Sequence, residues 1–176
     1  QRIEVDAIIM FQDILTPLAP VGAEFRFTPG PTLEAPIRTT VQVQALRPLN
    51  PQQDIPHVGE ILQGIQARLG GALPVLGFAG APVTLAFFMI AGQSPTRQIP
   101  DVLRFFSEAP KLVQTLLDYL TNFTIDYLHY QIDSGAHAVQ VFESMADVLP
   151  RELYEQFALP THERIFAALP KTTPAI

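Results

Sequence analysis

The chain has 176 residues, a hydrophobic content of 48%, no cysteine and a formal net charge of −6. This length and apolar content suit one domain with a sizeable core, and the negative charge argues against a general nucleic-acid binder. The absence of cysteine excludes disulfides, cysteine nucleophiles and cysteine zinc sites from these residues. It also fits a reducing compartment, so we expect a cytoplasmic location. No apolar run approaches the roughly 20 residues that span a membrane.

Three segments rich in apolar and β-branched residues are predicted to form buried strands of a parallel sheet: residues 5–11, 73–78 and 136–142. The proline-rich residues 25–37 are predicted to form an extended excursion or a hairpin. Prolines also interrupt the chain further on. Residues 41–54 are therefore predicted to be mostly loop, and residues 93–97 a polar loop.

Apolar residues at helical spacing, with prolines near the starts and glycines beyond the ends, predict the helices of the chain. These helices cover residues 56–69, 83–90, 101–107, 110–134 and 151–169. The resulting order of strands and helices implies parallel β/α units. Right-handed crossovers then place the carboxyl ends of all the strands at one face.

This order predicts an α/β fold, a partial (β/α)8 TIM barrel. A complete barrel has about 250 residues. We therefore expect residues 1–176 to form a single incomplete TIM-barrel domain with about half of the β/α units, a fragment of a longer protein that alone folds poorly and is inactive. The alternative is an open doubly wound sheet, but the phosphate-binding glycine fingerprint typical of that fold is absent from the sequence.

A run of small residues and a proline lies where the second strand is predicted to pass into a helix. The run consists of Gly77, Phe78, Ala79, Gly80, Ala81 and Pro82. Such a turn brings the backbone close to a neighbouring group, and in α/β folds ligands bind at such strand-to-helix turns. A tight turn without a ligand explains the same residues equally well. Pro82 suits the first position of the helix, where its missing N–H costs nothing.

Polar residues follow the first and third predicted strands. Asp13 is expected to be paired or functional, because burying a lone carboxylate is costly; an Asx turn is the structural alternative. Ser144 suits a helix N-cap or a plain turn, and no histidine–acid pair or nucleophile elbow marks it as a nucleophile. Glu143 either helps to position the site or forms a salt bridge with a neighbouring strand. The four histidines lack the spacing of metal ligands, so we expect no metal site.

Four stretches of the sequence, spread over nearly the whole chain, carry a family resemblance. They are Phe11-Gln-Asp-Ile-Leu15, Gly30-Pro31 with Pro36-Ile-Arg-Thr39, Gly77-Phe-Ala-Gly-Ala-Pro-Val-Thr-Leu85, and Ala138-Val-Gln-Val-Phe-Glu-Ser144 followed by Leu149, Tyr154 and Phe157-Ala-Leu-Pro160. In this order they resemble the uroporphyrinogen decarboxylase family of haem biosynthesis. The resemblance implies conversion of the four acetate arms of uroporphyrinogen III to methyl groups, giving coproporphyrinogen III. It also implies a TIM barrel, a homodimer and no cofactor.

The resemblance assigns roles to three residues. Asp13 matches the family's aspartate at the floor of the cleft, where it accepts hydrogen bonds from the pyrrole N–H groups and stabilises a cationic pyrrole. Ser144 is assigned to a hydrogen bond with a substrate carboxylate. Phe88 stands where the family usually has a tyrosine, so we expect it either to line the cleft without that hydroxyl or to pack in the core. The family's arginine-rich N-terminal segment and its C-terminal histidine have no counterpart in these residues.

Two other functions stay open at this point. A corrinoid-linked methyltransferase of the same superfamily shares the barrel, but it uses a thiolate zinc site and this chain has no cysteine. The other alternative is an inactive, truncated barrel.

Overall fold

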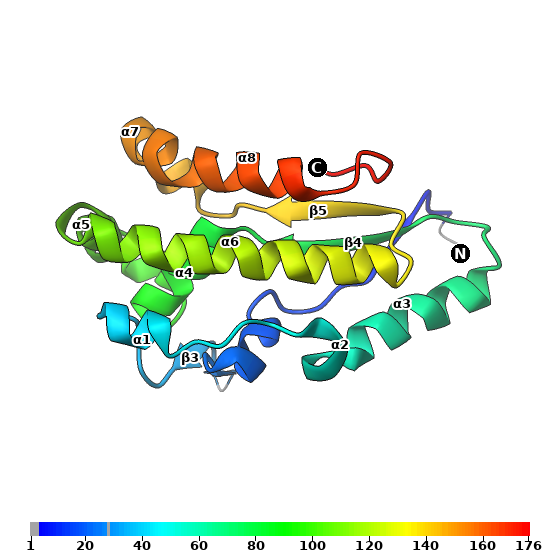
Figure 1. The fold of residues 1–176 in the computed structure, drawn as a ribbon, viewed down its shortest axis with the longest axis horizontal. Helices are drawn as coiled ribbons and strands as arrows, with labels where there is room; N and C mark the ends of the chain where they lie inside the picture. The colour runs from blue at the N-terminus through cyan, green and yellow to red at the C-terminus, as the bar shows by residue number, and fades with distance from the viewer. Residues whose placement is uncertain (1–3, 28) are drawn as a thin grey trace.

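The computed structural model describes residues 4–27 and 29–176, and a parallel sheet forms its centre (Figure 1). Strand β4 (Val75–Gly80) pairs in parallel with β1 (Ile8–Ile9) on one side and with β5 (Ala138–Phe142) on the other. A further parallel bridge joins Val139 to Ala175. The spatial order of these parallel segments therefore follows their order in the chain.

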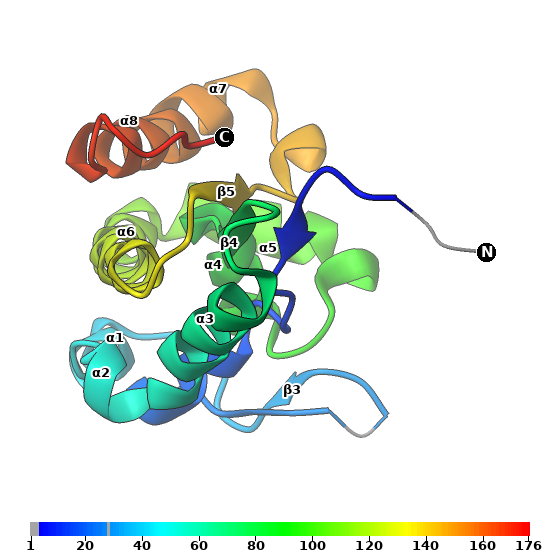
Figure 2. The ribbon, with the colours of Figure 1, turned by 90° about the vertical axis from the view of Figure 1, so that its right-hand side faces the viewer.

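Helices make each crossover from one parallel strand to the next. They are α1 (Thr40–Gln44), α2 (Pro51–Asp54), α3 (Pro56–Leu69), α4 (Pro82–Ala91), α5 (Ile99–Glu108), α6 (Pro110–Asp133), α7 (Arg151–Leu153) and α8 (Leu159–Ala168). Figure 2 shows α3, α6 and α8 on the same side of the strands. A sheet wound in chain order with its crossover helices on one side is part of a barrel, whereas a doubly wound sheet has helices on both faces. The predicted α/β partial barrel is confirmed.

A small antiparallel hairpin lies outside the parallel sheet, as the proline-rich segment predicted. Strand β2 (Phe25–Arg26) pairs with β3 (Thr32–Leu33), and Thr28 in the connection lies outside the described residues. The Leu33 N–H donates a 2.7 Å hydrogen bond to the carbonyl of Gly92. This bond ties the hairpin to the end of α4.

Some predicted boundaries are wrong, each for a local reason. Residues 41–54 are not mostly loop, since they hold most of α1 and all of α2. Helix α1 begins with a capping box, in which Thr39 accepts from the Gln42 backbone and the Gln42 side chain accepts from the Thr39 backbone. The final predicted helix contains a π turn at Tyr154–Ala158. Pro160 follows it and has no N–H for the carbonyl four residues earlier, which favours such a widening.

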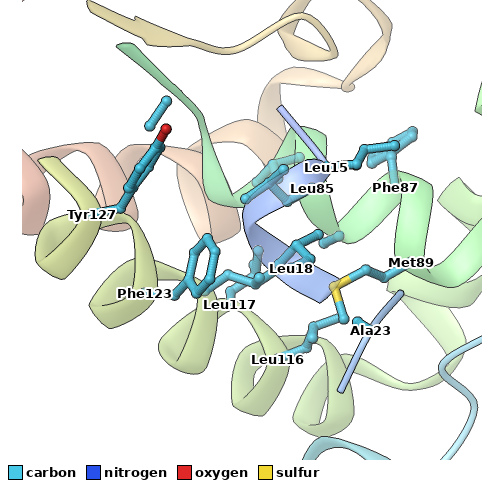
Figure 3. Close-up of a cluster of buried hydrophobic side chains, with 14 of the residues drawn as sticks. Leu15, Leu18, Ala23, Leu85, Phe87, Met89, Leu116, Leu117, Phe123 and Tyr127 are labelled. Carbon is cyan, nitrogen blue, oxygen red and sulfur yellow. The ribbon is translucent and has the colours of Figure 1, made fainter. Parts of the chain in front are cut away.

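Part of the hydrophobic core lies between α4, α6 and the segment that follows β1 (Figure 3). Helix α4 is buried almost all round, and its side chains meet those of α6 and of the chain that follows β1. The residues labelled in Figure 3 are Leu15, Leu18, Ala23, Leu85, Phe87, Met89, Leu116, Leu117, Phe123 and Tyr127. This packing fixes α4 directly beyond the end of β4.

The other face of the sheet carries a row of three aromatic rings. Phe11 stacks on Phe78 with ring centroids 5.4 Å apart, and Phe78 meets the edge of Phe142, also at 5.4 Å. The predicted burial of residues 5–11 is wrong for alternate positions: Met10 is buried in the core, whereas Ile9 is exposed and Phe11 is 78% exposed. Alternate strand residues point to opposite faces, so this row lies away from the helices.

Among the described residues, no helix has both the length and the apolar composition that crossing a membrane requires.

We expect residues 1–176, expressed alone, to self-associate through the exposed side chains of Ile9 and Phe11, because exposed apolar surface drives association. Phe11→Asp should lower the apparent mass in sedimentation velocity. The matched control is Val41→Asp, which also replaces an exposed apolar residue but on α1. A monomeric parent segment with a cooperative thermal transition would contradict this expectation.

Candidate functional site

The candidate site lies where the parallel strands end. Their carboxyl ends share one edge of the sheet, the edge at which barrel proteins bind their ligands. The N–H of Ala81, after β4, donates a 2.9 Å hydrogen bond to the carbonyl of Phe142, the last residue of β5. A Cβ added to Gly80 would lie 3.2 Å from the Cβ of Ile14, so the segment after β1 packs on the same turn. The structure thus brings the three predicted segments together.

Asp13 lies in the segment after β1 and is exposed. Its Oδ1 accepts a 2.8 Å hydrogen bond from the backbone N–H of Leu15. This is the Asx turn that the sequence offered as the structural alternative. The turn fixes the direction of the carboxyl group and also leaves it open to solvent. Its neighbour Ile14 contacts Gly80, so the backbone of Asp13 lies beside the end of β4.

The predicted strand-to-helix turn is shorter than expected. Gly77 to Gly80 belong to β4, and α4 begins at Pro82, which leaves Ala81 between them. Pro82 occupies the first turn of the helix, as predicted. The small residues serve packing here, since a Cβ on Gly80 would come within 2.9 Å of a Leu85 methyl group.

A buried glutamine that the sequence analysis missed explains Gly77. The Nε2 of Gln131 donates to the carbonyl of Phe78 at 2.9 Å, and its Oε1 accepts from the Phe78 N–H at 2.8 Å. A Cβ on Gly77 would collide with this carboxamide. The signal was available: Gln131 comes four residues after Tyr127, on the apolar face of α6, where a polar residue needs a partner.

Ser144 and Glu143 follow β5 and differ in their surroundings. Ser144 is exposed in the turn after the strand. The carboxylate of Glu143 accepts a 2.5 Å hydrogen bond from Thr84 Oγ1, and its other oxygen lies 3.2 Å from His162 Nε2. Glu143 therefore contacts the helices α4 and α8, so the salt bridge with a neighbouring strand, one of the two roles expected for it, is wrong.

Phe88 lies in α4, partly buried, and packs against the core cluster. Its carbonyl accepts the N–H of Gly92 at 2.8 Å, which closes the helix. Core packing therefore covers part of its side chain, and its contact with the cleft stays a prediction.

Next to Asp13, Gln12 donates a hydrogen bond to the hydroxyl of Tyr127, and burial raises the pKa of this phenol.

A metal ion would need several ligands close together. Across residues 4–27 and 29–176, no group of three or more histidine, aspartate or glutamate side chains is arranged to hold one. The chemistry that the site can offer comes from an exposed carboxylate, a hydroxyl, backbone groups at the strand ends and an adjoining aromatic face.

This arrangement defines an α/β barrel protein with a candidate site at the carboxyl ends of its strands. The likeness to a methyltransferase from Methanosarcina mazei supports the fold: the TM-score is 0.78 at 18% identity, over 97% of this chain and 50% of that chain.

The sequence comparisons show the family. The family model described as Uroporphyrinogen decarboxylase (URO-D) matches residues 1–176, so the chain belongs to that family and the predicted resemblance is confirmed. A uroporphyrinogen decarboxylase of Geobacter metallireducens is 39% identical over 98% of this chain and 51% of its own length. One from Synechococcus sp. (strain CC9605) is 42% identical over 96% and 48%. The chain thus spans about half the length of these relatives.

We expect Gly77→Ala to lower the free energy of unfolding by about 1–3 kcal/mol, because the new methyl group displaces Gln131 from the backbone of Phe78. Urea denaturation measures this change. The matched control is Gly64→Ala, on an exposed position of α3 with open space around it. That change should stabilise by about 0.5–1 kcal/mol, because alanine is the better helix former. Equal effects of the two substitutions would show that Gln131 is not the cause.

Proposed function

We propose that the protein removes the four acetate carboxyl groups of uroporphyrinogen III, giving coproporphyrinogen III. Family membership supports this activity, and the observation that carries it is the position of Asp13. The segment of Asp13 packs against Gly80 at the carboxyl edge of the sheet, beside the aromatic row of Phe11, Phe78 and Phe142. A carboxylate next to an apolar face suits a macrocycle whose ring is apolar and whose pyrrole N–H groups converge on its centre.

The proposed chemistry uses the pyrrole ring itself as the electron sink. Protonation of a pyrrole carbon next to an acetate arm gives a cationic ring. The bond between the acetate methylene and its carboxylate then breaks, carbon dioxide leaves, and the bonding electron pair neutralises the ring. A proton added to the resulting methylene gives the methyl group, and loss of the proton first added to the ring carbon restores the neutral pyrrole. This series of steps needs no metal or organic cofactor.

Asp13 is proposed to stabilise the cationic ring. Its carboxylate is held by the Asx turn to Leu15, so little reorganisation accompanies the development of positive charge. It also accepts hydrogen bonds from the pyrrole N–H groups. Ser144, exposed after β5, donates a hydrogen bond to a substrate carboxylate. Phe88 lines the cleft with an apolar ring in place of the usual tyrosine.

A cytoplasmic location, expected from the absence of cysteine, and a homodimer, implied by the family resemblance, belong to the same proposal. Sedimentation equilibrium on the protein at its full natural length measures the assembly.

The decisive test is Asp13→Asn in the protein at its full natural length, assayed for coproporphyrinogen. Asparagine keeps an oxygen for the Leu15 N–H and removes only the charge. We expect kcat to fall about 10²–10³-fold, as for the loss of one preorganised electrostatic group, with thermal unfolding unchanged. Asp6→Asn is the control, because Asp6 is exposed before β1, at the opposite end of the strand.

Equal turnover by the Asp13→Asn and parent proteins would rule out the electrostatic role. Failure of the parent to form any coproporphyrinogen would rule out the activity itself and favour the inactive barrel.

Phe88→Tyr tests the missing hydroxyl. If Phe88 faces the substrate, the new hydroxyl should raise kcat/KM about fivefold, the effect of a hydrogen bond of about 1 kcal/mol. Phe87→Tyr is the control: Phe87 is fully buried against Phe106, so its hydroxyl should lower stability without raising activity. An unchanged kcat/KM in a folded Phe88→Tyr protein would assign Phe88 to core packing.

A further inference from the structure

Glu143 is a nearly buried carboxylate with a partner for each oxygen. Its side chain is 10% exposed and that of His162 is 17% exposed. Oε1 accepts from Thr84 Oγ1 at 2.5 Å, and Oε2 lies 3.2 Å from His162 Nε2. Because a carboxylate only accepts, the imidazole nitrogen is the donor in this contact. Burying the charge is tolerated because both oxygens are bonded.

The side of the sheet on which Glu143 lies follows from strand alternation. Val139 is fully buried and Val141 packs against the core, so odd-numbered residues of β5 face the helices. Glu143 continues this series and meets two helices. Phe142 faces the aromatic row instead, and Ser144 follows in the exposed turn after the strand. The contacts of Glu143 with the helices thus restrain the backbone next to Ser144.

The partners of Glu143 belong to different elements of the fold. Thr84 is fully buried in the first turn of α4, and His162 is part of α8. The ring of Tyr154 meets the edge of the His162 ring, with centroids 6.0 Å apart and an angle of 65°. This contact restricts the rotation of the imidazole. Glu143 therefore joins the end of β5 to α4 and to α8 at a single point.

We propose that Thr84, Glu143 and His162 form a positioning network that sets where Ser144 lies relative to the end of β4. The inference rests on the proposed function, in which Ser144 binds a substrate carboxylate. Thr84 lies two residues after Pro82, so the network ties the start of α4 to the strand end that carries Ser144. The hydrogen bond from Ala81 to Phe142 supplies a second tie between the same two ends.

The first experiment is a mutant cycle in the protein at its full natural length. Thr84→Val keeps the side-chain shape and removes the hydroxyl. We expect it to raise KM for uroporphyrinogen about five- to tenfold with little change in kcat, because Ser144 binds substrate and transition state alike. Ser144→Ala should have the same effect. The double variant should be no worse than Ser144→Ala alone, because the two changes remove one interaction.

Conservative variants separate positioning from plain stability. Thr84→Ser retains the hydroxyl and should restore KM. His162→Leu should raise KM as Thr84→Val does, whereas His162→Gln keeps a donor nitrogen and should raise it less. Thr121→Val is the matched control, because Thr121 is also fully buried on a helix and donates its hydroxyl to Leu117 at 2.6 Å, away from Glu143. This control should change stability and leave KM unchanged.

Hydrogen exchange gives a measure that does not depend on activity. In Thr84→Val, the backbone amides of residues 143–145 should exchange faster, while those of β5 are unchanged. Additive effects of Thr84→Val and Ser144→Ala on KM, or unchanged exchange at residues 143–145, would overturn the positioning network. A parent protein that decarboxylates no uroporphyrinogen would instead overturn the proposed function, and the exchange experiment would still decide whether the network holds this turn.

Discussion

The close approach of the helices to strand β4 is the constraint on which the rest of the structure depends. β4 is the inner strand between β1 and β5, and it has glycine at the two positions where neighbouring side chains approach its backbone closely. At Gly77 the carboxamide of Gln131 reaches the backbone and bonds both polar groups of Phe78. At Gly80 the side chains of Ile14 and Leu85 close over the strand. A methyl group at Gly77 would displace the Gln131 carboxamide, and one at Gly80 would clash with Leu85 and Ile14.

The site is a consequence of this packing. Ile14 contacts Gly80, and this contact places Asp13 beside the end of β4. The hydrogen bond between Ala81 and Phe142 joins the end of β5 to the same point. Since α4 starts at Pro82 and is buried almost all round, the turn before it has little freedom. A rigid support of this kind is what a preorganised polar site requires.

The two carboxylates near the strand ends, Asp13 and Glu143, differ in burial and therefore in their hydrogen-bond partners. Asp13 is exposed and has the Leu15 backbone as its hydrogen-bond donor, so most of its charge is free to act on a ligand. Glu143 is nearly buried, and each of its oxygens has a side-chain partner. Its charge is satisfied within the protein, which suits it to holding elements together. The two carboxylates at this end of the sheet thus differ in how far the protein itself satisfies their charge.

The sequence by itself determined the parts that depend on local patterns. Apolar runs and proline positions predicted the parallel β/α order, and α3 begins and ends as its spacing indicated. The four ordered stretches, three of which lie around the strand ends, also led to the family. Asp13 and Ser144 became candidates through their position directly after apolar strands, and the resemblance supplied their proposed roles.

Only the tertiary structure decided which residues those strand ends touch. From the sequence, Gly77 and Gly80 were compatible with a ligand site or with a tight turn. In the structure, the side chains of Gln131 and Ile14 pack closely against these two glycines. Residues 41–54 have too little periodicity to predict helices, and α1 depends on a reciprocal cap. The partners of Glu143 lie 59 and 19 residues away along the chain. No local pattern specifies such contacts, because they arise only when the crossovers bring α4 and α8 to the same end of the sheet.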